Sequence, residues 1–253
     1  MDLKGAVAIV TGGNGGLGQR ICLKLAEAGA DIAVVCARSV KDAERVADDL
    51  ARGKGGNQVR ARAFAADLAD PKAITKLVDD VMAHFGRIDI LVNDAAYNIA
   101  IPFPDLDRLT LEEWQKIMSI NLTGPMLITK SVAPVMKRQG RGRIVNIASV
   151  AGLQPTGSSI AYAVSKAGLI HLTRCMAVAL APEVLVNCVA PGLLEGTRAT
   201  ANLMPAQIER SASSSLLKKA ADKDDCADQV VAMCRTETMT GQTVVIDAGR
   251  VFH

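Results

Sequence analysis

Three side chains that could move a proton lie close together in the middle of the chain: Ser149, Tyr162 and Lys166. Residues four apart on a helix share one face, so Tyr162 and Lys166 point the same way if this segment is helical. A phenol has an ordinary pKa of about 10, and a neighbouring ammonium lowers the pKa by favouring the phenolate. A Tyr/Lys pair at this spacing is often only an amphipathic surface pair. With Ser149 ahead of it, the set predicts proton transfer at a substrate oxygen.

A glycine-rich run near the start of the chain carries a second kind of chemistry. Five of its seven residues from Gly12 to Gly18 are glycine, in both the GxGxxG and GxxxGxG spacings. An apolar segment precedes the run and a helical pattern follows it, which is the context of a phosphate-binding turn. Free N–H groups at a helix start attract phosphate, and glycine lets the backbone approach it. We predict that a dinucleotide is held here by Gly12, Asn14, Gly16, Leu17 and Gly18.

The predicted strands and helices must position both the glycine-rich run and the set of Ser149, Tyr162 and Lys166. Strands are predicted over residues 6–10, 32–36, 59–65, 88–93, 143–149, 184–189 and 243–247. Helices are predicted over residues 17–28, 41–51, 71–85, 111–139 and 160–181. Strand alternating with helix at this spacing gives a parallel sheet with right-handed crossovers. The expected fold is α/β: a Rossmann-like, doubly wound, seven-stranded parallel sheet with helices on both faces, in one domain over residues 1–253.

One segment interrupts this alternation. Residues 193–220 contain no predicted strand and follow directly on the sixth strand. Long excursions at the carboxyl edge of a sheet are usually lids over a site, although a surface ornament is the alternative. We expect a mobile substrate lid here.

Composition and charge exclude several classes of protein. A net charge of +3 with scattered basic residues argues against nucleic-acid binding. We predict that no apolar run reaches the ~18 residues of a membrane span and that the N-terminus is not a signal peptide. The six cysteines have no CxxC spacing and suggest reduced core thiols, and the three histidines have no metal-ligand spacing. The expectation is a cytoplasmic protein without a catalytic metal.

Together, Thr11-Gly-x3-Gly-x-Gly18 and Ser149-x12-Tyr162-x3-Lys166 resemble the short-chain dehydrogenase/reductase family along nearly the whole chain. The resemblance implies that Tyr162 is the general acid/base and that Ser149 positions the substrate oxygen. It implies that Lys166 also holds the nicotinamide ribose. Asn121 matches the family asparagine that bends its helix and holds a water in the proton relay.

The resemblance implies further cofactor contacts beyond the glycine loop. They are Asp67, Leu68, Asn93, Ala95, Tyr162, Lys166, Pro191, Gly192 and Thr197. The chain departs from the family at residues 93–96, which read Asn-Asp-Ala-Ala where the family usually reads Asn-Asn-Ala-Gly. Asp94 and Ala96 are the two mismatches, so the detailed fit of the cofactor is in question at this point.

The choice between NADP and NAD depends on the end of the second strand. An acid there binds the ribose 2′-hydroxyl, whereas an arginine accepts a 2′-phosphate. Residues 36–39 read Cys-Ala-Arg-Ser, with no acid before Asp42. Arg38 and Ser39 resemble the phosphate-binding pair of NADP-dependent members, but Asn14 stands where many of those carry a basic residue. NADP is favoured, and NAD stays open.

We therefore expect an oxidoreductase that interconverts a small ketone and a secondary alcohol, as a homotetramer, with NADPH. The chain looks closest to 3-oxoacyl reductases, although Ala133, Pro134 and Val178 stand where those enzymes carry arginines for an acyl-carrier protein. One alternative is an NAD-dependent sugar, polyol or xenobiotic alcohol dehydrogenase. A non-catalytic dinucleotide-binding regulator is the other, but all four catalytic positions are kept.

Overall fold

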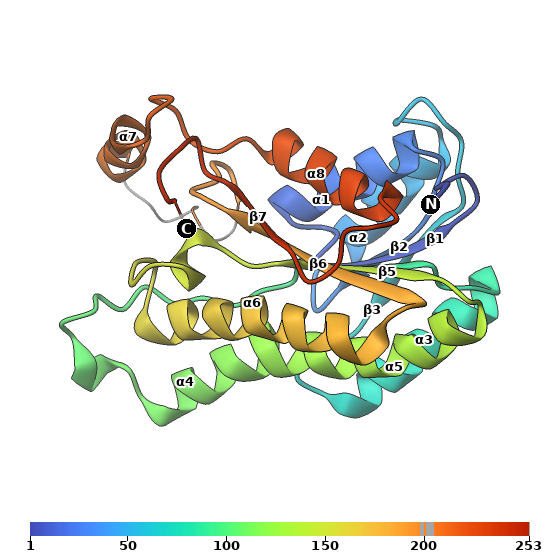
Figure 1. Ribbon diagram of the computed structural model, residues 1–253, viewed down its shortest axis with the longest axis horizontal. Helices are drawn as coiled ribbons and strands as arrows, with labels where there is room; N and C mark the ends of the chain where they lie inside the picture. The colour runs from blue at the N-terminus through green and yellow to red at the C-terminus, as the bar shows by residue number, and fades with distance from the viewer. Residues whose placement is uncertain (198–199, 201–204, 253) are drawn as a thin grey trace.

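The structure, a computed structural model, describes residues 1–197, 200 and 205–252. Part of the predicted lid, residues 198, 199 and 201–204, lies outside this range. One parallel sheet runs through the molecule, and helices cover both of its faces (Figure 1). The predicted fold class is confirmed.

The sheet contains seven strands in the order β3-β2-β1-β4-β5-β6-β7. They are β1 (Val7–Thr11), β2 (Asp31–Cys36), β3 (Ala61–Ala65), β4 (Ile90–Asn93), β5 (Gly142–Ile147), β6 (Val184–Pro191) and β7 (Thr243–Ile246). All six pairings are parallel. Strands β1, β2, β4, β5 and nearly all of β6 are buried, as continuous Val, Ile and Leu runs predict for a sheet covered on both sides.

The direction of winding reverses between β1 and β4, which lie side by side although the chain makes β2 and β3 between them. Thr11 at the end of β1 pairs with Asn93 at the end of β4. A crevice outside the carboxyl ends of the strands forms at such a reversal, and ligands of open α/β sheets bind there. The glycine loop and residues 94–96 both start at this point.

Eight α-helices are described: α1 (Gly16–Glu27), α2 (Val40–Ala51), α3 (Pro71–Phe85), α4 (Leu111–Met118), α5 (Gly124–Arg138), α6 (Ile160–Leu180), α7 (Pro205–Ser214) and α8 (Lys223–Arg235). Helices α1, α2 and α8 share one apolar core with the sheet. Helices α3 and α5 pack with the end of α6 in a second core on the opposite face. Figure 1 shows these two layers, with α4 beside α6.

Several predicted elements need correction. The fourth strand begins at Ile90 rather than at residue 88, the fifth ends at Ile147 rather than at residue 149, and α8 was not predicted. The predicted helix over residues 111–139 is interrupted by a π-helical turn, Ser119–Thr123, between α4 and α5. The third strand begins at Ala61 rather than at residue 59, because the preceding residues belong to the loop that leads into the sheet edge. Within the predicted lid, α7 is a helix, and Leu194 forms an isolated parallel bridge with Ala221. This part of the chain is therefore more regular than its composition predicts.

Helix α6 also corrects the expectation that no segment is apolar enough to span a membrane. By length and composition it passes that test, with 21 residues and a mean hydropathy of 1.2. It packs along β6, and eight of its residues are buried, among them Lys166. It is a core helix of the fold.

Candidate active site

A cleft of about 550 Å³ opens at the carboxyl ends of the strands. Its walls come from the glycine loop, the ends of β2 to β6 and the start of α6. The predicted residues that line it are Gly12, Asn14, Gly16, Leu17, Arg38, Asp67, Leu68, Ala95, Ser149, Tyr162, Lys166, Pro191, Gly192 and Thr197. Four predicted residues, Gly18, Ser39, Asn93 and Asn121, do not line it.

The glycine loop forms a narrow turn into α1. Gly12 has a φ of +68°, in the left-handed region that favours glycine. A methyl group on Gly18 would lie 2.2 Å from the Gly12 carbonyl oxygen, so only glycine fits there. The N-cap of α1, Gly15, makes no side-chain hydrogen bond to the first turn. The N–H groups at this helix start lie beside glycine backbone on the cleft wall, an arrangement that fits the pyrophosphate of a dinucleotide.

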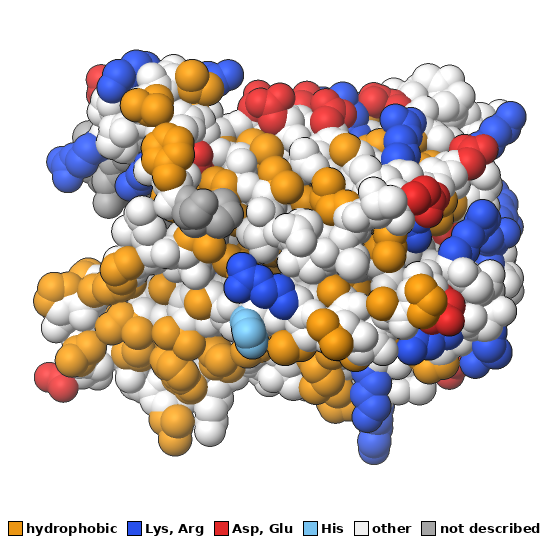
Figure 2. All heavy atoms as spheres, in the orientation of Figure 1, with side chains coloured by type: hydrophobic (Ala, Val, Ile, Leu, Met, Phe, Trp, Pro, Cys, Tyr) orange, Lys and Arg blue, Asp and Glu red, His pale blue; other side chains and the backbone are white. Residues whose placement is uncertain are grey.

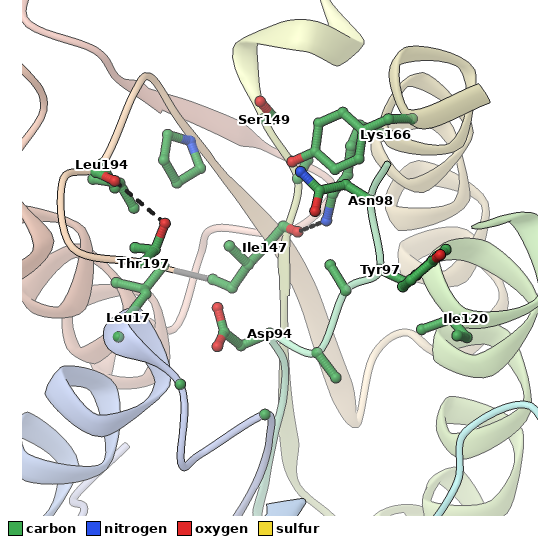
Figure 3. Close-up of a pocket in the computed structure, with 18 of the residues that line it drawn as sticks. Leu17, Asp94, Tyr97, Asn98, Ile120, Ile147, Ser149, Lys166, Leu194 and Thr197 are labelled. Carbon is green, nitrogen blue, oxygen red and sulfur yellow. Dashed lines mark hydrogen bonds between the residues drawn. The ribbon is translucent and has the colours of Figure 1, made fainter. Parts of the chain in front are cut away.

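Ser149, Tyr162 and Lys166 all line the cleft, and Figure 3 shows Ser149 and Lys166 on the same side of it. Ser149 lies two residues after the end of β5. Ser159 caps α6 by accepting a hydrogen bond from the Tyr162 N–H at 3.2 Å. One turn later, the buried Lys166 ammonium donates to the Ile147 carbonyl oxygen at 2.7 Å. It lies 5.7 Å from the centre of the Tyr162 ring.

The surroundings of Tyr162 raise the pKa of its phenol. The prediction that Lys166 lowers this pKa is therefore wrong for the protein without a bound dinucleotide. Burial is the main cause, and Asp94 adds to it, while a side-chain hydrogen bond with Ser149 acts in the opposite direction. Burial also lowers the pKa of Lys166 to about 8, against the opposing effect of Asp94. The phenol therefore holds its proton at neutral pH, as a proton donor must.

Asn121 lies behind the cleft wall, in the π-helical turn, and is fully buried. Its Oδ1 accepts from the Tyr97 N–H at 2.7 Å, and its Nδ2 donates to the Tyr97 carbonyl oxygen at 2.9 Å and to Ser165 Oγ at 3.1 Å. The amide thus holds the backbone of Tyr97, which lines the cleft. The helix is interrupted here by the π-helical turn, a form frequent at functional sites.

The end of the cleft at β2 carries Arg38, which is exposed, together with Asp67 and Leu68 after β3. The buried Asn14 side chain donates to the Ser39 carbonyl oxygen at 3.2 Å and so joins the glycine loop to this end. Asn93 faces the sheet interior instead, where its Nδ2 donates to Asn146 Oδ1 at 2.8 Å. Ser39 and Asn93 therefore support the cleft from behind.

Thr197 lines the opposite side of the cleft, where its hydroxyl donates to the Leu194 carbonyl oxygen at 3.3 Å (Figure 3). Lys116, Ile120 and Arg250 also line the cleft, although they were not predicted. Ile120 adjoins Asn121, and Lys116 lies one turn before it, so these two could have been found on the same helix face. Arg250 comes from the C-terminal tail, and no local pattern indicates it.

Within the described part of the chain, no three His, Cys, Asp or Glu side chains gather where they could hold a metal ion. None of the six cysteines forms a disulfide, and five of them are buried. The cleft wall thus combines a phenol, a hydroxyl and an ammonium with a phosphate-binding turn and with the Asp94 carboxyl group.

Comparison with known proteins agrees with this arrangement. Residues 6–208 match the family described as short chain dehydrogenase. The granaticin polyketide synthase putative ketoacyl reductase 2 of Streptomyces violaceoruber is 38% identical over 244 residues, which cover 96% of this chain and 95% of that protein.

Two solved structures share the fold over nearly their whole length. The NADPH-dependent 3-quinuclidinone reductase from Rhodotorula rubra is 25% identical, with a TM-score of 0.87, over 98% of this chain and 92% of its own. An NAD⁺-bound xylitol dehydrogenase is 28% identical, with a TM-score of 0.86, over 98% of this chain and 100% of its own. Relatives of this fold thus use either dinucleotide.

Proposed function

The chain belongs to the short-chain dehydrogenase/reductase family and is an NAD(P)-dependent oxidoreductase acting on CH–OH groups, and on that premise we propose that it reduces a small ketone with NADPH. One observation supports this most strongly. Ser149, Tyr162 and Lys166 meet on the wall of a cleft that also includes the glycine loop. A proton donor and a dinucleotide site thus face the same space.

In the direction of reduction, the hydride for the carbonyl carbon would come from a dinucleotide held along the glycine loop. The substrate oxygen takes its proton from the Tyr162 hydroxyl, and the Ser149 hydroxyl hydrogen-bonds the same oxygen. Loss of the proton leaves a phenolate, which the Lys166 ammonium stabilises from within the same helix face. The ketone gains one hydride and one proton and leaves as a secondary alcohol.

We propose that Asn121 positions Tyr97 rather than touching the substrate. Both hydrogens of its amide nitrogen already have partners in the protein. The role that the family resemblance implies, holding a water in the proton relay, stays a prediction.

The substrate class can be tested directly. The purified protein would be incubated with NADPH or NADH and a panel of ketones, including a small 3-oxoacyl thioester, and with alcohols and polyols in the reverse direction. We expect consumption of NADPH with ketones, followed by the absorbance of the reduced nicotinamide. Turnover of polyols with NAD and of no ketone would favour the alternative dehydrogenase. No turnover in any combination would contradict an enzymatic role.

Replacing Arg38 with aspartate is expected to turn the preference from NADPH toward NADH. The guanidinium lies on the cleft wall next to the end of β2, and a charge-assisted contact with the 2′-phosphate is worth about 1.5–3 kcal/mol, or roughly 10- to 100-fold in affinity. The measurement is the dissociation constant of each dinucleotide by fluorescence titration. Arg45→Asp makes the same charge change on α2 outside the cleft and should leave the preference unchanged. Tighter binding of NADH than NADPH by the unmodified protein would contradict the assignment.

We also propose a homotetramer. Apolar side chains lie along α4 and α6 on the outside of the molecule, as Figure 2 shows over the lower part of that view. Leu111 on α4 and Val164 and Val178 on α6 are exposed, Val178 to 84%. A symmetric contact between copies would cover such a face.

Light scattering at micromolar concentration is expected to give about four times the chain mass of 26.6 kDa. Val178→Glu should lower that mass by placing a charge in the apolar face. Lys72→Glu, on the outside of α3, is the matched control and should not. A mass of one chain for the unmodified protein would refute the proposal.

A further inference from the structure

Asp94 occupies a position at the reversal of the sheet where the family resemblance leads one to expect asparagine. Because Thr11 pairs with Asn93 in register, the next residues, Gly12 and Asp94, leave the sheet side by side. Thr11 Oγ1 accepts from the N–H groups of Asp94 at 3.1 Å and Ala95 at 3.2 Å, which fixes the direction of this loop. The pairing of β1 with β4 thus places the Asp94 carboxyl group beside the glycine loop.

The Asp94 carboxyl group lies against two glycines of that loop. Its Oδ2 would be 3.3 Å from a methyl group on Gly12 and 2.9 Å from one on Gly18. The backbone N–H of Gly18, in the first turn of α1, hydrogen-bonds the carboxylate and lowers its pKa. Helix α1 has no acidic residue in its own first turn. Asp94 therefore places a carboxylate at the helix start that would also attract a phosphate.

Asp94 lies on the cleft wall and is half-buried, since one side faces the cleft (Figure 3). Burial raises the pKa of its carboxyl group to about 7, although Lys166 and the Gly18 N–H act in the opposite direction. The other titratable groups that feel its charge are Tyr162 on α6, Cys22 on α1 and Cys226 on α8. Each of these has a raised pKa and is neutral at pH 7 to 8, so Lys166 is the one neighbouring charge among them.

We propose that Asp94 takes up a proton from solvent when the dinucleotide binds, so that a neutral carboxylic acid lies beside the pyrophosphate in the complex. The inference rests on the proposed function, since it assumes that the cleft binds a dinucleotide. The Asp94 carboxylate and the pyrophosphate would repel each other at one helix start. The bound dinucleotide would also cover the side of Asp94 that faces the cleft. Both effects favour the neutral acid.

If Asp94 takes up a proton on binding, the affinity for the dinucleotide falls as the pH rises. Well below pH 7 the Asp94 carboxyl group is mostly protonated in the free protein, so the affinity for the dinucleotide changes little with pH there. Above pH 7 the free protein must first gain a proton, and linkage gives at most about tenfold weaker affinity for each pH unit. The asparagine of Asp94→Asn is neutral at every pH. This variant should therefore lose the part of the pH dependence of affinity that Asp94 causes. Lys166 has a pKa of about 8 and titrates close by, so affinity alone does not separate the two groups.

Difference infrared spectroscopy separates them, because a protonated carboxyl group has a carbonyl band that neither lysine nor cysteine contributes. Spectra would be recorded at pH 7.5 with and without NADH, which carries no 2′-phosphate, and repeated with NADPH. We expect binding to produce a protonated-carboxyl band in the unmodified protein and none in Asp94→Asn. Asp79→Asn is the matched control, since Asp79 is an exposed acid on α3 outside the cleft, and it should keep the band.

The outcomes are distinguishable. Binding of dinucleotide by the unmodified protein without the band would overturn the inference, whether or not the variants fold. A band of equal size in Asp94→Asn would place the proton on another carboxyl group and overturn it as well. Failure of the unmodified protein to bind either NADH or NADPH in a fluorescence titration would instead contradict the proposed function.

Discussion

Tyr162→Phe is expected to lose turnover almost completely while keeping its affinity for the dinucleotide. The substitution removes only the hydroxyl that faces the cleft and hydrogen-bonds Ser149, and it leaves the ring and its packing in place. General acid–base groups contribute about 10²- to 10⁴-fold to rate, and coupling to hydride transfer adds to that loss. The measurement is kcat with a ketone identified in the substrate screen, together with the dissociation constant for NADPH.

Tyr97→Phe is the matched control, because Tyr97 is the only other tyrosine in the chain and lines the same cleft. Its hydroxyl donates to Glu113 at 3.3 Å, away from Ser149 and Lys166. We expect its kcat to stay within about tenfold of the unmodified protein, below the range of a general acid. A Tyr162→Phe variant with a third or more of the original activity would contradict the assignment of Tyr162.

Gly18→Ala is expected to weaken dinucleotide binding at least about 100-fold and to lower the free energy of unfolding by about 1–3 kcal/mol. The added methyl group would lie 2.2 Å from the Gly12 carbonyl oxygen and 2.8 Å from its carbon. Both are backbone atoms, which cannot rotate away as a side chain can. The loop must therefore move off the first turn of α1, where the phosphate would bind. Fluorescence titration with NADPH and urea unfolding would measure the two effects.

Gly15→Ala serves as the control within the same loop. Its methyl group would lie 3.1 Å from the Gly12 carbonyl oxygen, a tight contact that a small shift relieves. We expect a loss of affinity at least tenfold smaller than in Gly18→Ala. Equal NADPH affinity and equal unfolding midpoints for Gly18→Ala and the unmodified protein would show that the narrow turn is not required.

The features that the sequence determined by itself are local in the chain. The strand–glycine–helix order around residues 12–18 predicts its own conformation, because glycine spacing and the following helical pattern act within one turn. Tyr162 and Lys166 share a face for the same reason. The buried apolar strands predict a sheet covered on both faces, and the structure confirms it.

Contacts between residues far apart in sequence depend on the tertiary structure. Nothing near residue 94 indicates that its carboxyl group reaches Gly18, since this depends on β1 lying beside β4. The π-helical turn at Asn121 contacts a distant segment of the chain. The Asn121 side-chain amide makes two hydrogen bonds to the backbone of Tyr97. The raised pKa of Tyr162 likewise reflects burial by surrounding elements, which outweighs the effect expected from its nearest charged neighbour in sequence. Spacing along the chain sets which groups share an element, whereas burial and charge depend on how the elements pack together.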